Sequence, residues 1–129
     1  MFAKIKSLGL FGLNAFPVDV EVDISKGMPH FDIVGLPDIA VKESRERIRA
    51  ALYSIAVILP PKHIVVNLAP ADVKKSGTMH DLAILVGILK SMGHLSVSMN
   101  DKFFIGEVSL SGEVRSVNGV LPMTILARS

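Results

Sequence analysis

One polar loop in the sequence has the residue types to bind an anion, and its members are Lys74, Lys75, Ser76, Gly77 and Thr78. The loop directly precedes an apolar stretch that predicts a helix. The first backbone amides of a helix have no partner inside the helix and carry partial positive charge, so a phosphate or a carboxylate could dock there. We favour a capped helix with a solvated loop, because Thr78 or Asp81 could accept hydrogen bonds from those amides and Asp81 would repel an anion.

A second cationic group lies upstream, in a segment whose apolar spacing predicts a helix, and consists of Lys42, Arg45, Arg47 and Arg49. Such a face could contact the phosphate backbone of a nucleic acid. Glu43 and Glu46 dilute its charge, however, and Glu43 is spaced to pair with Arg47 one turn later. The chain has no tryptophan and one tyrosine, so stacking on bases has little support. We favour a solvated face, or a docking face for another domain.

The sequence contains no motif for binding a metal ion or a nucleotide. The histidines, His30, His63, His80 and His94, are scattered without the spacing of a metal site. The nearest approach to a phosphate-binding loop is the run from Gly87 to Ser91, which lacks the glycine before Lys90 and falls inside a predicted helix. Without cysteine there is no thiolate ligand, disulfide or cysteine nucleophile. We expect no metal, cofactor or nucleotide in this segment.

Composition indicates a single compact domain. The chain has 129 residues, half of them apolar, and a formal net charge of only +2. Its longest apolar runs are far shorter than the about 18–20 residues that a membrane-spanning helix needs. The first 16 residues resemble a signal peptide in having Lys4 and Lys6 before an apolar stretch, but no cleavage site follows. We expect a cytoplasmic protein with no membrane partner.

The first half of the sequence predicts three strands and a helix. Apolar and acidic residues alternate over residues 18–24, which is the pattern of a half-buried strand. Strands over residues 2–8 and 30–34 would complete an antiparallel meander. Asp38 stands where a helix N-cap belongs, and apolar residues at helical spacing continue to Ile55, before the break at Pro60 and Pro61.

The second half predicts a strand, a helix, a hairpin and a last helix. Residues 63–68 are apolar on both faces, as in a central strand covered on both sides. A buried helix over residues 82–92 would end at Gly93, and strands over residues 103–110 and 113–117 would flank a turn at Ser111 and Gly112. The last helix, with Pro122 in its first turn, runs to Ser129 without a stop signal. The order βββαβαββα predicts an α+β domain with a mixed sheet over residues 1–129, cut before a further domain.

Three blocks of the sequence, in order, resemble the N-terminal domain of the Mg-chelatase-related AAA+ proteins of bacteria, a family that includes ComM- and YifB-like proteins. The blocks run from Gly35 to Leu52, from Asn67 to Leu89 and from Gly106 to Pro122. The resemblance covers nearly the whole chain. It implies a Lon-protease-like domain of the ribosomal protein S5 domain 2-like fold. It also implies a downstream AAA+ motor domain that would bind ATP and Mg²⁺.

The same resemblance implies that the protease chemistry of the fold is missing. Active Lon domains use a serine at the start of the helix after the polar loop and a lysine after a later strand and turn. Aligning those two motifs places Met79 at the serine position and Leu121 at the lysine position. A thioether cannot be acylated and an alkyl group cannot take a proton, so both roles of nucleophilic catalysis would be lost.

The resemblance therefore implies a non-catalytic module of a ring-forming ATPase or helicase that acts on DNA in branch migration, recombination and natural transformation. Its partners would be its own AAA+ domain and neighbouring subunits of a homo-oligomeric ring, with a hexamer as the family's expected form. DNA is a further candidate partner. The alternative is a protein- or peptide-binding adaptor that keeps the former substrate cleft. A third hypothesis, an active serine hydrolase, would be revealed by labelling with a fluorophosphonate.

Overall fold

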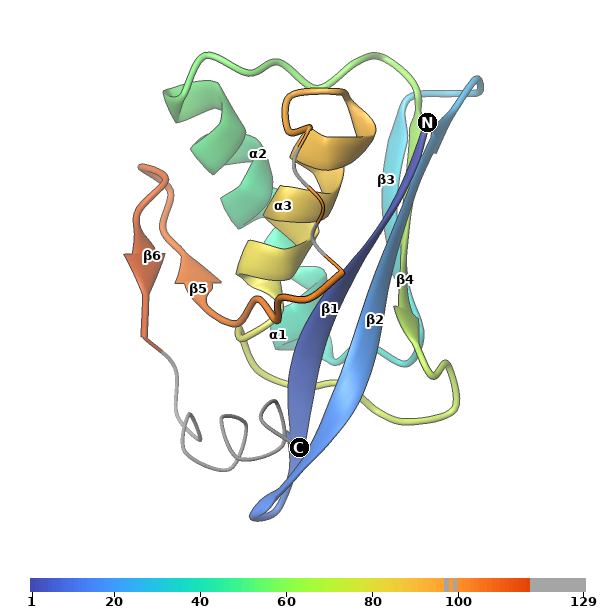
Figure 1. The fold of residues 1–129 in the computed structure, drawn as a ribbon. Helices are drawn as coiled ribbons and strands as arrows, with labels where there is room; N and C mark the ends of the chain where they lie inside the picture. The colour runs from blue at the N-terminus through green and yellow to red at the C-terminus, as the bar shows by residue number, and fades with distance from the viewer. Residues whose placement is uncertain (97, 99, 117–129) are drawn as a thin grey trace.

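The protein folds as two layers, with helices packed on one face of a β-sheet (Figure 1). The structure is a computed structural model that describes residues 1–96, 98 and 100–116. Helices α2 (Ser44–Ser54) and α3 (Asp81–Ser91) cover the sheet, and a small hairpin lies beside them. The expected α+β class with a mixed sheet is confirmed.

The sheet has four strands in the order β1-β2-β4-β3. Their bounds are β1 Phe2–Phe11, β2 Asn14–Ser25, β3 His30–Val34 and β4 His63–Ala69. Strands β1 and β2 pair antiparallel, as do β2 and β4, whereas β3 pairs with β4 in parallel. The predicted meander of three strands is therefore wrong. A strand, a helical crossover and a second strand form a parallel βαβ unit, and this unit places β4 between β2 and β3.

Strand β4 is central, but only one of its faces is covered. Ile64, Val66 and Leu68 are buried, whereas the alternate residues, including His63 and Asn67, are only partly buried. The expectation of cover on both sides is thus wrong, because both long helices lie on the same face of the sheet (Figure 1). The other face carries the acidic side chains of β2 and remains partly exposed, as the alternation of that strand predicts.

The helix predicted over residues 38–55 is present but interrupted. Helix α1 (Ile39–Lys42) is capped by Asp38, whose carboxylate accepts from the backbone N–H of Val41 at 2.8 Å, as predicted. Glu43 ends α1 and is the N-cap residue of α2, but its side chain makes no capping hydrogen bond. Its carbonyl accepts from the N–H of Glu46 in a tight turn. Helix α3 matches its prediction within one residue, and Gly93 ends it with a φ of +82°.

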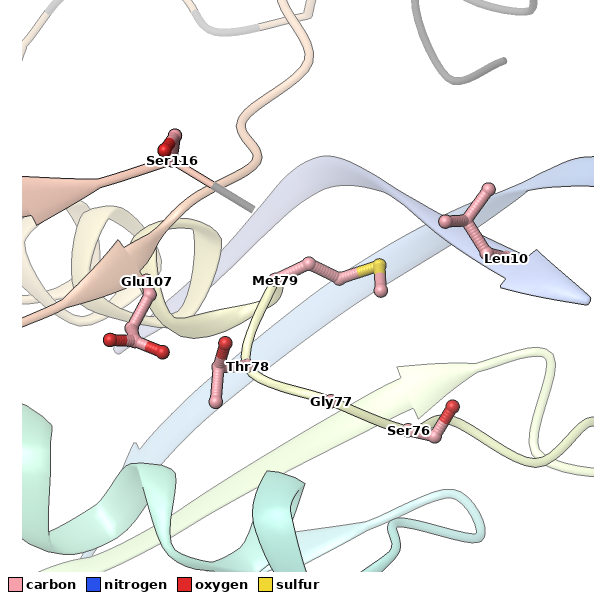
Figure 2. A pocket seen from close by; sticks show the side chains of 7 residues that line it. All are labelled: Leu10, Ser76, Gly77, Thr78, Met79, Glu107 and Ser116. Atoms are coloured by element: carbon pink, nitrogen blue, oxygen red, sulfur yellow. The ribbon is translucent and has the colours of Figure 1, made fainter. Parts of the chain in front are cut away.

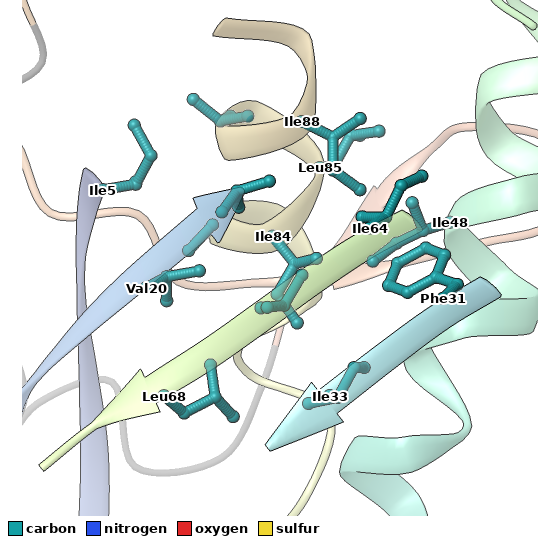
Figure 3. Close-up of a cluster of buried hydrophobic side chains, with 14 of the residues drawn as sticks. Ile5, Val20, Phe31, Ile33, Ile48, Ile64, Leu68, Ile84, Leu85 and Ile88 are labelled. Atoms are coloured by element: carbon teal, nitrogen blue, oxygen red, sulfur yellow. The ribbon is translucent and has the colours of Figure 1, made fainter. Parts of the chain in front are cut away.

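The core lies between the sheet and α2 and α3 (Figure 3). It includes Val20 from the sheet, Ile48 from α2 and Ile84 from α3, all fully buried. Gly87 lets α3 approach β2 closely, because a Cβ at that position would lie 2.7 Å from the Val22 side chain. This contact fixes the height of α3 above the sheet, and with it the position of the loop that precedes α3.

The C-terminal hairpin is shorter than predicted. Strands β5 (Glu107–Val108) and β6 (Val114–Arg115) have two residues each. The segment before β5 instead follows the outer edge of β1, where the N–H of Phe104 donates to the carbonyl of Lys6 at 2.9 Å. The end of the predicted second hairpin strand and the predicted last helix lie outside the described residues.

Within the part of the chain that the structure describes, we find no helix of the length and hydrophobicity needed to cross a bilayer.

We predict that Gly35→Ala destabilises the fold by about 2–4 kcal/mol. Gly35 has a φ of +102°, and an added Cβ would lie 2.3 Å from the carbonyl oxygen of Leu68. Gly12→Ala is the matched control, since Gly12 also has a positive φ (+62°) but an added Cβ there would have no atom within 4 Å. Urea unfolding of both variants should show the larger loss for Gly35→Ala, and equal losses would contradict the close approach.

Candidate functional site

A cavity of about 430 Å³ opens where the loop before α3 meets β1 and the hairpin. Its lining residues, drawn in Figure 2, are Leu10, Ser76, Gly77, Thr78, Met79, Glu107 and Ser116. This volume is in the range of small-ligand sites. The cavity contains three residues of the predicted anion-binding loop together with Met79, the residue aligned with the protease serine.

The cavity provides hydroxyl groups without a lysine or histidine among its described lining residues. Ser76, Thr78 and Ser116 supply the hydroxyls, and Met79 extends its thioether toward Leu10 (Figure 2). Among the described lining residues no lysine or histidine is present, and Glu107 is the one titratable group. A serine or threonine needs an adjacent base to act as a nucleophile. Leu121, aligned with the protease lysine, lies outside the described residues.

A buried carboxylate holds the wall of the cavity in place. Asp81, the first residue of α3, is fully buried. It accepts from Arg47 at 2.6 Å (Nε) and 3.0 Å (Nη2), from the N–H of Val108 at 3.1 Å, and from the hydroxyl of Ser44. These bonds join α2, α3 and β5. The hydrogen bond to Asp81 raises the pKa of Arg47 above its usual value, so the guanidinium stays charged.

This arrangement corrects two expectations. The sequence spacing predicts Arg47 on the solvated face as the partner of Glu43, but its side chain is 19% exposed and its Nη2 also donates to the carbonyl of Ala40. The sequence also allows Asp81 to cap the α3 amides, but its carboxylate faces α2 and the hairpin. The first amides of α3 have other partners, since Asp81 N–H donates to the Thr78 carbonyl and Leu82 N–H to the Gly106 carbonyl.

The predicted anion-binding loop is divided between a buried and an exposed part. Lys75 is 1% exposed, and its Nζ donates to the carbonyl of Gly35 at 2.9 Å and to the carbonyl of Pro70. Burial lowers the pKa of Lys75. The ammonium therefore holds two loops together and does not face the cavity. Lys74 and Ser76 on either side are exposed, and the N–H of Gly77 donates to Asp38 at 3.3 Å.

His80 is the second buried titratable group beside this loop. Its Nδ1 lies 3.2 Å from the hydroxyl of Ser7, and its buried Nε2 has no hydrogen-bond partner among the described residues. Burial, the largest cause, lowers the pKa of His80 to about 4, with a smaller contribution from the charge of Lys75, while Asp81 and Asp38 oppose the shift. The ring is therefore neutral at neutral pH.

The remaining histidines do not form a metal centre. His30 and His63 lie on either side of Asp32, each with a ring nitrogen 3.0 Å from one of its carboxylate oxygens. The hydrogen bond from His63 is the main cause that lowers the pKa of Asp32. His94 is exposed after α3. Across residues 1–96, 98 and 100–116, no group of three potential ligands is arranged to hold a metal ion.

Two members of the second predicted cationic group, Arg45 and Arg49, lie beside β3, which is an edge strand of the sheet. Arg45 donates to the carbonyl of Phe31 at 3.3 Å, and Arg49 lies over the Phe31 ring at 5.7 Å. Lys42 is exposed at the end of α1. Lys62, which was not predicted from the sequence, lines a small hollow together with Arg49. No spacing in the sequence links Lys62 to this face, because the sheet brings the two segments together.

Comparison with known proteins gives consistent matches over almost the entire chain. A family model described as subunit ChlI of Mg-chelatase matches residues 20–129. Competence protein ComM of Haemophilus influenzae is 42% identical over 127 residues, covering 98% of this chain and 25% of that protein. The uncharacterized protein YifB of Escherichia coli is 42% identical over 111 residues, covering 85% and 22%. An uncharacterized protein of Mycobacterium bovis is 36% identical over 123 residues, covering 95% and 24%. The chain spans about a quarter of the length of these curated relatives.

We predict that Asp81→Ala destabilises the protein by about 3–5 kcal/mol, because it leaves the Arg47 guanidinium without its buried partner. Arg49→Ala is the matched control on the same helix as Arg47, since the Arg49 side chain is 50% exposed and its ion pair with Glu46 spans 3.9 Å. Arg49→Ala should lower the free energy of unfolding by less than about 1 kcal/mol. Urea unfolding measures both values, and a small loss for Asp81→Ala would contradict its role in joining the elements.

We predict that His80 makes the fold sensitive to acid. Its pKa is lowered from 6.5 to about 4 on folding, so the unfolded chain binds the proton more tightly. Stability from this group is complete above pH 6.5 and is lost as the pH falls toward 4, by about 3 kcal/mol in total. The free energy of unfolding of His80→Asn, which cannot titrate, should fall less than that of the native protein over this window. If the free energy of unfolding of the two proteins fell in parallel with pH, His80 would be excluded as the cause of the acid sensitivity.

Proposed function

Because this chain belongs to the family of subunit ChlI of Mg-chelatase, we propose that it is a non-catalytic module of a longer, competence-related AAA+ ATPase. Identities of 42% over nearly the whole chain to ComM and YifB support the family assignment. ATP and Mg²⁺ would bind in an AAA+ domain of the longer protein, which we place outside this chain because the chain spans about a quarter of the length of its relatives. The longer protein would act in the cytoplasm on DNA, in recombination or branch migration.

The fold that we propose for the module is the Lon-protease-like, ribosomal protein S5 domain 2-like class. The mixed sheet, the βαβ unit and the polar loop before α3 support this assignment. The single observation that carries the non-catalytic role is the position of Met79. Its thioether lines the cavity where a protease of this class would need a serine, and none of the described lining residues is a lysine or histidine.

Ring assembly is the role that we assign to the module within the longer protein. Large apolar side chains remain exposed at the end of α2 and after it, among them Tyr53 at 79% and Ile58 at 78%. Contiguous apolar exposure of this kind is typical of contact surfaces. The partners would be the module's own AAA+ domain and neighbouring subunits of a homo-oligomeric ring. Lys42, Arg45, Arg49 and Lys62 are the candidate DNA contacts.

A second candidate function is a protein- or peptide-binding adaptor. The observation that favours it is the cavity itself, which combines apolar walls at Leu10 and Met79 with hydroxyl groups and one carboxylate. A mixed lining of this kind suits a peptide better than a polyanion, because Glu107 would repel phosphates. The adaptor role is compatible with assembly, since the cavity and the exposed end of α2 use different residues.

The test of the leading proposal compares the longer protein with a version lacking residues 1–129. Sedimentation velocity with ATP should show a ring that becomes smaller or dissociates without the module. A double variant, Tyr53→Ser and Ile58→Ser, should weaken assembly at least tenfold, whereas Phe11→Ser and Leu13→Ser, equally exposed at the β1–β2 turn, should not. Unchanged rings in the truncated protein would refute the assembly role. Labelling of the 129-residue chain by a fluorophosphonate would refute the non-catalytic one.

A further inference from the structure

Glu107 is the one charged side chain among the described residues that line the 430 Å³ cavity. Its side chain is 28% exposed and extends beside Thr78 (Figure 2). Within the described part of the chain, no hydrogen bond ends on its carboxylate oxygens. A half-buried carboxylate without hydrogen bonds is less well solvated than one in water, so a donor that enters the cavity gains a strong acceptor.

The cations around Glu107 leave it accessible. Arg115 lies 3.6 Å away, but its side chain is 61% exposed and this distance is longer than a hydrogen bond. Such an exposed pair contributes little and can be exchanged for another cation. Arg47 also adds positive potential, but its Nε and Nη2 donate to Asp81. Lys75 is enclosed by two backbone carbonyls and does not line the cavity.

Two apolar side chains also line the cavity. Met79 and Leu10 extend toward one another from the loop and from β1 (Figure 2). A methionine side chain adapts its shape to a flexible partner. Lysine and arginine side chains combine an aliphatic stem, which covers apolar surface, with a charged head. The cavity offers the two complementary surfaces to one such side chain.

We propose that this cavity binds a basic side chain, lysine or arginine, of an extended peptide segment in a partner protein. The aliphatic stem lies on Met79 and Leu10, and the cationic head donates to Glu107 in place of Arg115. The hydroxyls of Thr78, Ser76 and Ser116 accept or donate to the remaining polar atoms of the peptide. The inference rests on the adaptor function given above and names the class of its ligand.

The test uses the 129-residue chain with ¹³C-methyl methionine and the capped peptides Ala-Ala-Lys-Ala-Ala, Ala-Ala-Leu-Ala-Ala and Ala-Ala-Glu-Ala-Ala. Titrations are followed by the methyl resonance of Met79, assigned through Met79→Leu. We expect the lysine peptide to shift this resonance with at least tenfold higher affinity than the leucine peptide, and the glutamate peptide not to bind. Raising the salt concentration should lower the affinity for the lysine peptide more than the affinity for the leucine peptide.

The matched variants are Glu107→Gln and Glu113→Gln. Glu113 is exposed on the same hairpin and does not line the cavity. Glu107→Gln should lower the affinity for the lysine peptide at least tenfold, and Glu113→Gln should leave it within twofold, with both methyl spectra otherwise native. Equal binding of the lysine and leucine peptides would overturn the basic ligand while leaving the adaptor function. Binding of none of the peptides would overturn both, and neither result bears on ring assembly.

Discussion

The buried carboxylate of Asp81 is the interaction on which the rest of the structure depends. It begins α3, and its partners belong to α2 and to β5, so three segments that are far apart in sequence meet at one charge. A charge in a low-dielectric interior is tolerated only when it is paired and hydrogen-bonded, and this one has four donor contacts. The geometry around Asp81 therefore determines where the loop before α3 runs, and hence the shape of the cavity.

The sequence predicted most of the elements but not how they pair. Local signals were sufficient for the Asp38 cap, for the alternating strand β2 and for the Gly93 stop, because each depends on neighbouring residues only. The position of β4 between β2 and β3 depends on the crossover through α1 and α2, which the apolar run itself does not encode. The first hairpin strand falls short of its predicted length because Phe103 and Phe104 pair with Lys6 of β1 and Gly106 bonds to Met79 and Leu82 instead.

In the candidate site too, neighbouring residues could be predicted to lie together, whereas contacts between distant segments could not. Met79, Ser76 and Thr78 line the cavity together, as their proximity in sequence suggests. The burial of Lys75 and the pairing of Arg47 could not be predicted from local sequence. Gly35 lies 40 residues from Lys75 in the chain, and Asp81 lies 34 residues from Arg47. Burial of Lys75 and pairing of Arg47 remove two cations from the surface. The polar loop consequently presents hydroxyls and backbone groups to the cavity, and Glu107 is the one charged residue among the described lining residues, which weakens the case for an anion site.

A hydroxyl and an imidazole do meet in this protein, at Ser7 and His80, but they meet in the core and not in the cavity. Ser7 is fully buried and His80 is 1% exposed, so a substrate carbonyl cannot reach the serine oxygen. The cavity, in contrast, is accessible, and its described lining residues offer hydroxyls with no lysine or histidine among them. Nucleophilic catalysis requires the hydroxyl, the base and the substrate at one place. Here the buried imidazole does not line the cavity that holds the accessible hydroxyls, which supports a binding role for the cavity.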